Sequence, residues 1–407
     1  MSKQTVGGAS QAPQAAAAQR RTRTLLMLGL PLFWSALYVY SSYLSVYAKE
    51  VGASLAMVGV IVASYGFTQL VVRIPLGIAS DRIGKRKPFA LMGGLVGALS
   101  CATLLAAPQP WVLLLGRGLA GVAAATWVAT SVLLISSYPS DQVARATSVG
   151  MALTGLGSTV SSYLGGWLAD VAGPRAPFWA GIAIGLTCTA VFALIVEPPA
   201  PNRTPLTVRS LLAVGRTPIL LIGSLLALLY QYISFAMGSA FVPVYARELS
   251  ATSSQLGALM ALMQGFYALV AYFAGSIGAR LGNRNTAVVG LGLTALSALL
   301  TPHAQTMGVL YVLRALHGVG MGLSAPVLMA VPMAAIAPEK RGAAMGFYQA
   351  IYAIGMVAGP AISGVLADGP GLAFTFYTVG GLGLLAVVIA AVFLPGEKRR
   401  ADKTASA

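Results

Sequence analysis

Charge is scarce in this sequence, and negative charge is scarcer still. Only 9% of the 407 residues are charged, and Asp and Glu together number ten. A soluble protein of this length would carry roughly 25% charged residues, so the composition excludes an ordinary soluble domain. Cysteine is limited to Cys101 and Cys188, both in apolar stretches, which predicts neither a disulfide nor a metal site. Nucleophile constellations and phosphate-cradling loops are missing too, so we expect neither an enzyme nor a cofactor.

Long apolar runs take the place of charge. Hydrophobic residues make up 57% of the chain, and the mean hydropathy is +0.79. About a dozen runs are each long enough to cross ~30 Å of hydrocarbon. Since backbone groups in lipid must bond internally and strict alternation is missing, the runs are predicted to be transmembrane helices. The expected spans are 24–47, 54–80, 88–107, 110–136, 144–167, 176–196, 218–243, 255–279, 286–302, 306–333, 343–366 and 371–394.

The second half of the chain repeats the first. Residues 46–50 (VYAKE) recur as 244–248 (VYARE), and the Leu-Ala-Asp at 168–170 recurs at 366–368, in both cases 198 residues later. Corresponding segments of a parallel repeat face the same side, so each half must hold an even number of spans. We therefore predict an all-α membrane protein of twelve helices in two six-helix bundles, with a substrate site between them.

The repeat and the composition set the expected boundaries. We expect a disordered tail at 1–23, a first bundle at 24–196, a linker at 197–217, a second bundle at 218–394 and a tail at 395–407. The net charge of +16 could suggest nucleic acid as a partner, but most basic residues gather in the tails and in alternate loops. The opposite loops hold only Lys49, Arg175 and Arg247. This asymmetry predicts a multi-pass cell-membrane protein with both termini in the cytoplasm, and no role in nucleic-acid binding.

One loop carries a specific motif. After the second span the sequence reads GIASDRIGKRK, with Gly77, Asp81, Arg82, Gly84 and Arg86 at its key positions. Glycines permit close helix packing and a tight turn, and the acid can pair with a nearby arginine or with a helix N-terminus. The copy in the second half is degraded, with alanine at position 279 where the first half has the acid.

This loop resembles the signature loop of the major facilitator superfamily, and the resemblance covers nearly the whole chain. It implies a secondary transporter, closest in pattern to drug or metabolite antiporters that exchange with protons. It also implies that Asp81 latches the inner gate when the carrier opens outward. The alternative is that the basic residues of the loop only fix its topology.

Ionisable groups inside the hydrocarbon are few and carry no negative charge. None of the ten acids lies in mid-span, whereas Arg117 and Arg314 occupy matching places, ~12 Å below the outer face. His317 follows Arg314 by one helical turn, and a histidine there could bind and release a proton. The fourth-span pattern around Arg117 resembles a family motif linked to proton coupling. The alternative for these residues is a role in packing, and Arg73 is expected to extend to the interface.

Aromatic and amide side chains gather on the spans that would line a central cavity. The candidates that we single out for a substrate pathway are Tyr38, Gln231, Gln264, Gln349 and Tyr352. Gly359 and Pro360 on the eleventh span predict a bend useful for gating. Their glycine spacing is similar to an antiporter motif, but that motif belongs to the fifth span, which weakens the inference of antiport.

Together these features predict a monomeric transporter of small organic molecules in the lipid bilayer, working by alternating access. Since the chain offers no buried acid for a cationic cargo, we expect proton-coupled export of neutral or anionic compounds. Uptake or exchange of an organic anion is an alternative. A membrane sensor on the same scaffold, which moves nothing, is an alternative of another class.

Overall fold

The computed structural model describes residues 8–106, 108–139, 142–197 and 213–396, and their regular secondary structure is helical. The first half comprises α1 (Gly8–Tyr38), α2 (Leu44–Glu50), α3 (Leu55–Ile83), α4 (Lys87–Ala106), α5 (Pro110–Ala125), α6 (Trp127–Ser136), α7 (Val143–Ala172) and α8 (Ala176–Ala193). The second half comprises α10 (Pro218–Phe235), the π-helix η2 (Ala236–Phe241), α11 (Val242–Glu248), α12 (Ser253–Leu281), α13 (Asn283–Leu300), α14 (Met307–Ala334), α15 (Arg341–Asp368) and α16 (Leu372–Phe393). Two short 3-10 helices, η3 (Thr301–His303) and η4 (Pro338–Lys340), lie in its loops.

Twelve membrane crossings result, as the sequence predicts. Ten of the helical stretches in the described part of the chain are long and apolar enough to cross a bilayer by themselves. The other two crossings are α1, whose first half is polar and carries Arg20, Arg21 and Arg23, and α7, which is rich in Gly, Ser and Thr. The fold is therefore all-α, with two six-helix bundles related by a parallel repeat.

The start of the chain differs from our expectation. We predicted a disordered tail over residues 1–23, but α1 already begins at Gly8. The run of four alanines at 15–18 has the highest helix propensity of any residue type, and it extends the first span backwards. Thr22 is buried, and its hydroxyl donates to the carbonyl of Val196 at 2.6 Å. The rest of the expected tails and most of the linker (1–7, 198–212 and 397–407) lie outside the described residues.

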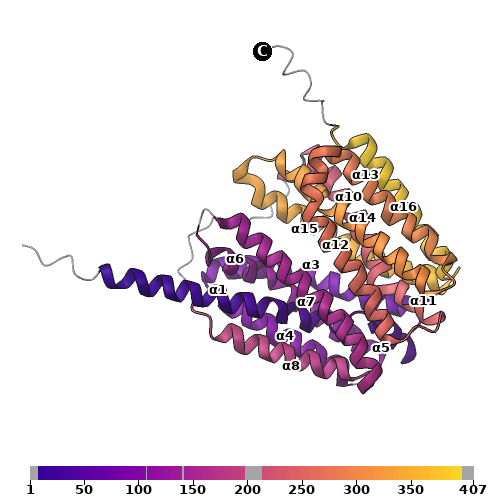
Figure 1. Cartoon of the computed structure of the whole chain (residues 1–407), viewed down its shortest axis with the longest axis horizontal. Helices are drawn as coiled ribbons and strands as arrows, with labels where there is room; N and C mark the ends of the chain where they lie inside the picture. The colour runs from indigo at the N-terminus through magenta and orange to yellow at the C-terminus, as the bar shows by residue number, and fades with distance from the viewer. Residues whose placement is uncertain (1–7, 107, 140–141, 198–212, 397–407) are drawn as a thin grey trace, which may run out of the picture.

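Two helix pairs join the halves. In Figure 1, α3 and α7 of the first half lie against α15 and α12 of the second, while α4 and α8 lie on one side of the molecule and α13 and α16 on the other. Glycines make these contacts close. A Cβ at Gly59 would collide with the carbonyl of Pro360, and one at Gly257 would lie 2.8 Å from the carbonyl of Ser162. Such small-residue contacts are how helices pack closely in lipid.

The first span of each half is broken at the same place. Residues 39–43 form turns between α1 and α2, and 198 residues later η2 interrupts the seventh span. Pro243 has no N–H to donate to the carbonyl four residues back, that of Ser239. The hydroxyl of Ser45 donates to this carbonyl instead. This bond joins α2, just past the first break, to the second break, and it satisfies a carbonyl that the irregular backbone leaves free at this depth.

Candidate functional site

Arg117 lies on α5 in an aromatic setting. Its side chain is buried, and its guanidinium carbon is 4.4 Å from the ring centre of Tyr65 on α3 and 5.7 Å from that of Tyr40 in the first break. Its Nη1 donates to the hydroxyl of Tyr40 at 3.4 Å. Ring faces attract a cation most strongly when water is excluded. Among the described residues, the charge of Arg117 is therefore stabilised by rings and a phenol and not by the carbonyls that a packing role would predict, and its Nε has no partner.

Arg314 lies on α14 at the matching place but in poorer surroundings. It is equally buried, and its Nη2 donates only to the thioether sulfur of Met263, at 2.6 Å. Its Nε and Nη1 have no partner among the described residues, and neither ring nitrogen of His317, one turn further on, has one. At the repeat distance of 198, Tyr65 corresponds to Met263 and Tyr40 corresponds to Gly238. The second half has therefore lost both rings.

No carboxylate accompanies either arginine within the described ranges. The ion pairs found there are Asp81 with Arg86, Glu248 with Lys49 and Glu50 with Arg247, all at the ends of helices. A guanidinium in the membrane interior without an anion is energetically costly. The centre of the molecule is thus cationic, as the distribution of acids in the sequence implies.

The polar pathway candidates are all half-buried, and two of them join the halves. The amide nitrogen of Gln264 on α12 donates to the hydroxyl of Ser162 on α7 at 3.3 Å. The phenol of Tyr352 on α15 accepts from Nη1 of Arg73 on α3 at 2.9 Å. The remaining three are Tyr38, which packs on Trp34, and Gln231 and Gln349, whose amides make no hydrogen bond within the described ranges.

Arg73 has a different position from the one expected, and Tyr65 and Phe235 were not among the expected site residues. We expected Arg73 to extend to the interface, but its side chain is half-buried and turns inward to the other half. Tyr65 stacks on Phe235 of α10, with ring centres 6.1 Å apart, and so also bridges the halves. Long apolar runs hide such contacts, because the face that an aromatic residue presents depends on how the helices pack.

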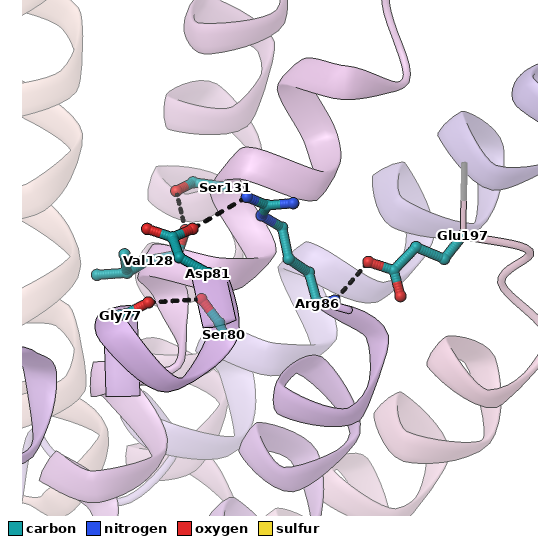
Figure 2. A network of polar contacts seen from close by, with 7 residues as sticks. All are labelled: Gly77, Ser80, Asp81, Arg86, Val128, Ser131 and Glu197. Atoms are coloured by element: carbon teal, nitrogen blue, oxygen red, sulfur yellow. Dashed lines mark hydrogen bonds and ion pairs between the residues drawn. The ribbon is translucent and has the colours of Figure 1, made fainter. Parts of the chain in front are cut away.

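The signature loop forms a compact polar network, drawn in Figure 2. Asp81 accepts from Nη2 of the buried Arg86 at 3.1 Å, an ion pair within the first half. Glu197, just beyond α8, accepts from the backbone N–H groups of Arg86 and Lys87 and so caps the first turn of α4. Negative charge is stabilising there. The role of Glu197 was also missed, although an acid at the end of a span was visible in the sequence.

The glycines and the second basic residue of this loop have different surroundings. Gly84 ends α3 with φ +67°, a conformation that few other residues adopt. Gly77 does not serve a close helix contact as we expected, since a Cβ there would meet only Val128, at an ordinary 3.9 Å. Arg82 is exposed.

The other end of the molecule ties the halves together. We call the end with the loops at 84–86, 282 and 335–340 the basic end, and the end with the loops at 51–54, 173–175, 249–252 and 369–371 the opposite end. Four contacts cross between the halves at the opposite end. Two are the ion pairs of Lys49 with Glu248 at 4.0 Å and of Glu50 with Arg247 at 2.8 Å.

The other two contacts at the opposite end are helix caps supplied by the facing half. Asp170 at the end of α7 accepts from the backbone N–H groups of Ser253 and Ser254 at 2.9 and 2.7 Å, at the start of α12. Asp368 at the end of α15 accepts from that of Leu55 at 2.8 Å, at the start of α3. All four contacts obey the repeat. The charged members of these contacts reveal the repeat in the sequence, but nothing in the sequence indicates this role.

The glycine-proline pair on α15 lies where three helices meet. A Cβ at Gly359 would collide with the carbonyl of Tyr232 on α10, and the carbonyl of Pro360 lies against Gly59 on α3. α15 continues through Pro360 as one helix. The missing N–H of a proline leaves a carbonyl without its helical donor one turn earlier. The bend that we expected at this pair stays a prediction.

Two repeat-related bundles, joined along two helix pairs around a cationic, aromatic interior, define a multi-pass membrane transporter. The sequence model of the Major Facilitator Superfamily matches residues 26–245 and 220–407, so the chain belongs to this superfamily. Its members are transporters and not enzymes.

Relatives and solved structures agree with that assignment. The chain is 24% identical over 338 residues to an uncharacterized MFS-type transporter of Methanocaldococcus jannaschii, covering 81% of this chain and 87% of that one. It is 29% identical over 159 residues to the quinolone resistance protein NorA of Staphylococcus aureus, covering 39% of this chain and 40% of NorA. Similar structures are the nucleoside transporter NupG (TM-score 0.76, 14% identity, 92% of this chain and 100% of that one) and the human organic anion transporter MFSD10 (0.65, 19%, 91% and 99%). At these identities the structures show a shared fold.

Proposed function

We propose that this protein exports neutral or anionic organic solutes across the cell membrane by alternating access, coupled to protons. The observation that carries the proposal is the pair of buried arginines in matching places, with no carboxylate beside either in the described part of the chain. Relatives support the general class of cargo: one is named for quinolone resistance and a structural neighbour for organic anion transport.

The positive charge of the two arginines determines which solutes the centre can accept. A cationic solute entering the centre would meet Arg117 and Arg314 with no internal anion to offset them, and like charges repel strongly where water is excluded. A neutral solute meets aromatic rings and amides, and an anionic one is attracted. The half-buried Tyr38, Gln231, Gln264, Gln349 and Tyr352 supply the mixed apolar and hydrogen-bonding surface that small organic ligands favour.

The contacts between the halves suggest which state is captured. The opposite end is tied by two ion pairs and two helix caps, so that face is closed. The basic end faces the cytoplasm if its arginines and lysines follow the usual rule of membrane topology. On this proposal the structure is the state closed to the outside, and Asp81, held by Arg86 within its own half, engages the second half only after the carrier turns outward.

Proton coupling is assigned to His317. It is buried on α14 next to Arg314, and imidazole is the side chain that changes charge most readily near neutral pH. Binding of a proton there would alter the charge of the centre during the cycle. Substitution His317→Gln keeps hydrogen-bonding capacity but cannot titrate, so it should flatten the dependence of transport on pH. An unchanged pH profile would remove His317 from the mechanism.

Reconstitution tests the proposal as a whole. Purified protein in liposomes would be given a panel of aromatic acids, their neutral amides and cationic amines, with and without a pH gradient. We expect flux of the acids and amides and none of the amines. This flux should be faster when the proton concentration is higher on the side of the membrane that the opposite end faces. Flux of amines alone would refute the assignment of cargo.

The same arginines also favour the alternative of uptake or exchange of an organic anion. The driving force separates the two proposals. A proton-coupled exporter accumulates cargo on the proton-rich side, against the concentration gradient of the cargo, whereas an exchanger needs anion on both sides of the membrane. A sensor without transport would bind compounds from the panel and move none of them.

A further inference from the structure

We infer that Arg314 and His317 form the binding site for the oxyanionic group, a carboxylate or sulfonate, of the transported solute, and that Arg117 does not take part in this binding. The inference rests on the proposed function and narrows it, because it assigns the two repeat-related arginines to different tasks. The site lies between α14, α12 and η2.

The first step is the lack of partners in the second half. Arg314 is 2% exposed, and its Nε and Nη1 are buried without a hydrogen bond in the described structure. The thioether of Met263 is its one acceptor, and sulfur in methionine accepts weakly. His317 is 0% exposed, and both its ring nitrogens are buried and unpaired. Buried polar groups normally have partners. Nε is unpaired at Arg117 too, but the unpaired Nη1 of Arg314 and ring nitrogens of His317 have no counterpart there, and they indicate that a ligand supplies partners in the second half.

The second step is the contrast within the repeat. Arg117 lies over the rings of Tyr40 and Tyr65 and donates to the hydroxyl of Tyr40, so its charge is already offset by groups of the protein, although its Nε is unpaired. The residues that replace these tyrosines are Gly238, which has no side chain, and Met263, which is unbranched and flexible. A Cβ at Gly238 would lie 3.7 Å from Nη2 of Arg314 and from the sulfur of Met263. The guanidinium is therefore bounded on this side by a glycine, which adds no side chain, and by a flexible side chain that can move aside.

The third step is the backbone around the site. Gly238 belongs to η2, and single turns of π-helix occur mainly at functional sites. Met263 lies one residue before Gln264 and one turn before Tyr267, and both of these are half-buried. A solute that contacts Gln264 and Tyr267 with its apolar body would bring an attached anion within one helical turn of Met263, and so of Arg314.

The chemistry of the donors selects the ligand group. A guanidinium presents planar N–H groups that match two oxygens of one anionic group, and a neutral imidazole adds one N–H donor. Oxygens of a carboxylate or sulfonate would displace the sulfur of Met263 from Arg314, because they are stronger acceptors. A neutral amide offers one carbonyl oxygen and no charge, so it would gain much less from the same groups.

Binding is tested with the full-length protein in nanodiscs. The probes are indole-3-acetate, 1-naphthoate and benzenesulfonate, each compared with its neutral amide, and the readouts are thermal stabilisation and affinity by calorimetry. We expect the anions to bind more tightly than the amides. Substitution Arg314→Gln should weaken anion binding roughly thirtyfold or more, as for loss of one member of a buried charge pair. Amide binding should change little.

Arg117→Gln is the matched control, since it removes the same charge at the repeat-related position. Although its flux should fall, we expect it to keep the preference for anions over amides in binding, whereas His317→Gln should lose part of that preference. The inference is overturned if none of the three anions binds more tightly than its amide, or if Arg117→Gln and Arg314→Gln lose the preference equally.

Flux in liposomes separates this inference from the proposed function. If amides and anions are transported equally by the wild type and by Arg314→Gln, export stands and the oxyanion site is wrong. If anions bind through Arg314 but nothing is transported, the site stands and the proposed function is wrong.

Discussion

Arg117 and Arg314 occupy matching places in the two halves, but only the first has aromatic partners. The same repeat keeps its symmetry at the opposite end, where Asp170 and Asp368 cap the facing half in the same way. It is broken again at the basic end, where the second half has Ala279 in place of Asp81. The halves are thus equivalent where they tie to each other and differ at the centre and at the basic end.

The largest effect that separates the two arginines should come from Arg117→Ala. Arg117 joins the first break, through Tyr40, to α3, through Tyr65, so its loss should uncouple them and lower flux at least tenfold. Flux in liposomes measures this, with Arg145→Ala, an exposed arginine of α7, as the control. Retained flux would reject a mechanistic role for Arg117.

Exchanging the partners of the two arginines should give stability changes of opposite sign. Met263→Tyr would offer Arg314 the ring that Arg117 has and raise the free energy of unfolding by about 1–2 kcal/mol, the strength of a desolvated cation–π contact. Tyr65→Met should lower it by a similar amount. Chemical unfolding in detergent measures both. Changes of the same sign would show that the contrast between the halves does not lie in these rings.

A smaller effect is expected at the signature loop. Asp81→Asn removes the ion pair between Asp81 and Arg86. Because the carboxylate is partly solvated, the pair contributes about 1 kcal/mol or less, so the ratio of inward-open to outward-open states should change by roughly fivefold. Labelling of introduced cysteines at both ends reports the balance. Ala279→Asn, at the repeat position without an acid, is the matched control. An equal shift in both variants would contradict a latch specific to the first half.

The smallest and most symmetrical effect should come from the opposite end. Asp170→Asn and Asp368→Asn each weaken a charged cap on a helix N-terminus, which contributes about 0.3–1 kcal/mol. Since the two caps lie on different helix pairs and share no partner, the double variant should open that end by the sum of the two effects. Distances between spin labels on the two halves measure the opening. Clearly unequal effects of the two substitutions would break the symmetry inferred here.

Much of the fold could be predicted because lipid restricts the choices. Apolar runs of sufficient length have to be helices, and the parallel repeat required an even number of spans in each half. The position of Arg117 and Arg314 followed from the repeat alone. The early start of α1 was not predicted, because the helix propensity of an alanine-rich segment is a weak signal when the neighbouring residues are polar.

The candidate site could be predicted only in part, and contacts between helices explain why. Nothing in the local sequence of Arg73 distinguishes an arginine that reaches the interface from one that donates to Tyr352 of the other half. The carbonyl of Ser239 is freed by Pro243, which is visible in the sequence, but its acceptance of the Ser45 hydroxyl needs the two breaks to meet.

The sequence by itself determined the membrane location of this protein, its twelve helices, its duplication and the absence of acids from the middle of its spans, because each follows from composition and periodicity along the chain. Only the tertiary structure decided which arginine has aromatic partners and which has a single thioether. Partners in a helical membrane protein come from neighbouring helices, and the rotation of each helix about its axis is set by packing that no single span encodes.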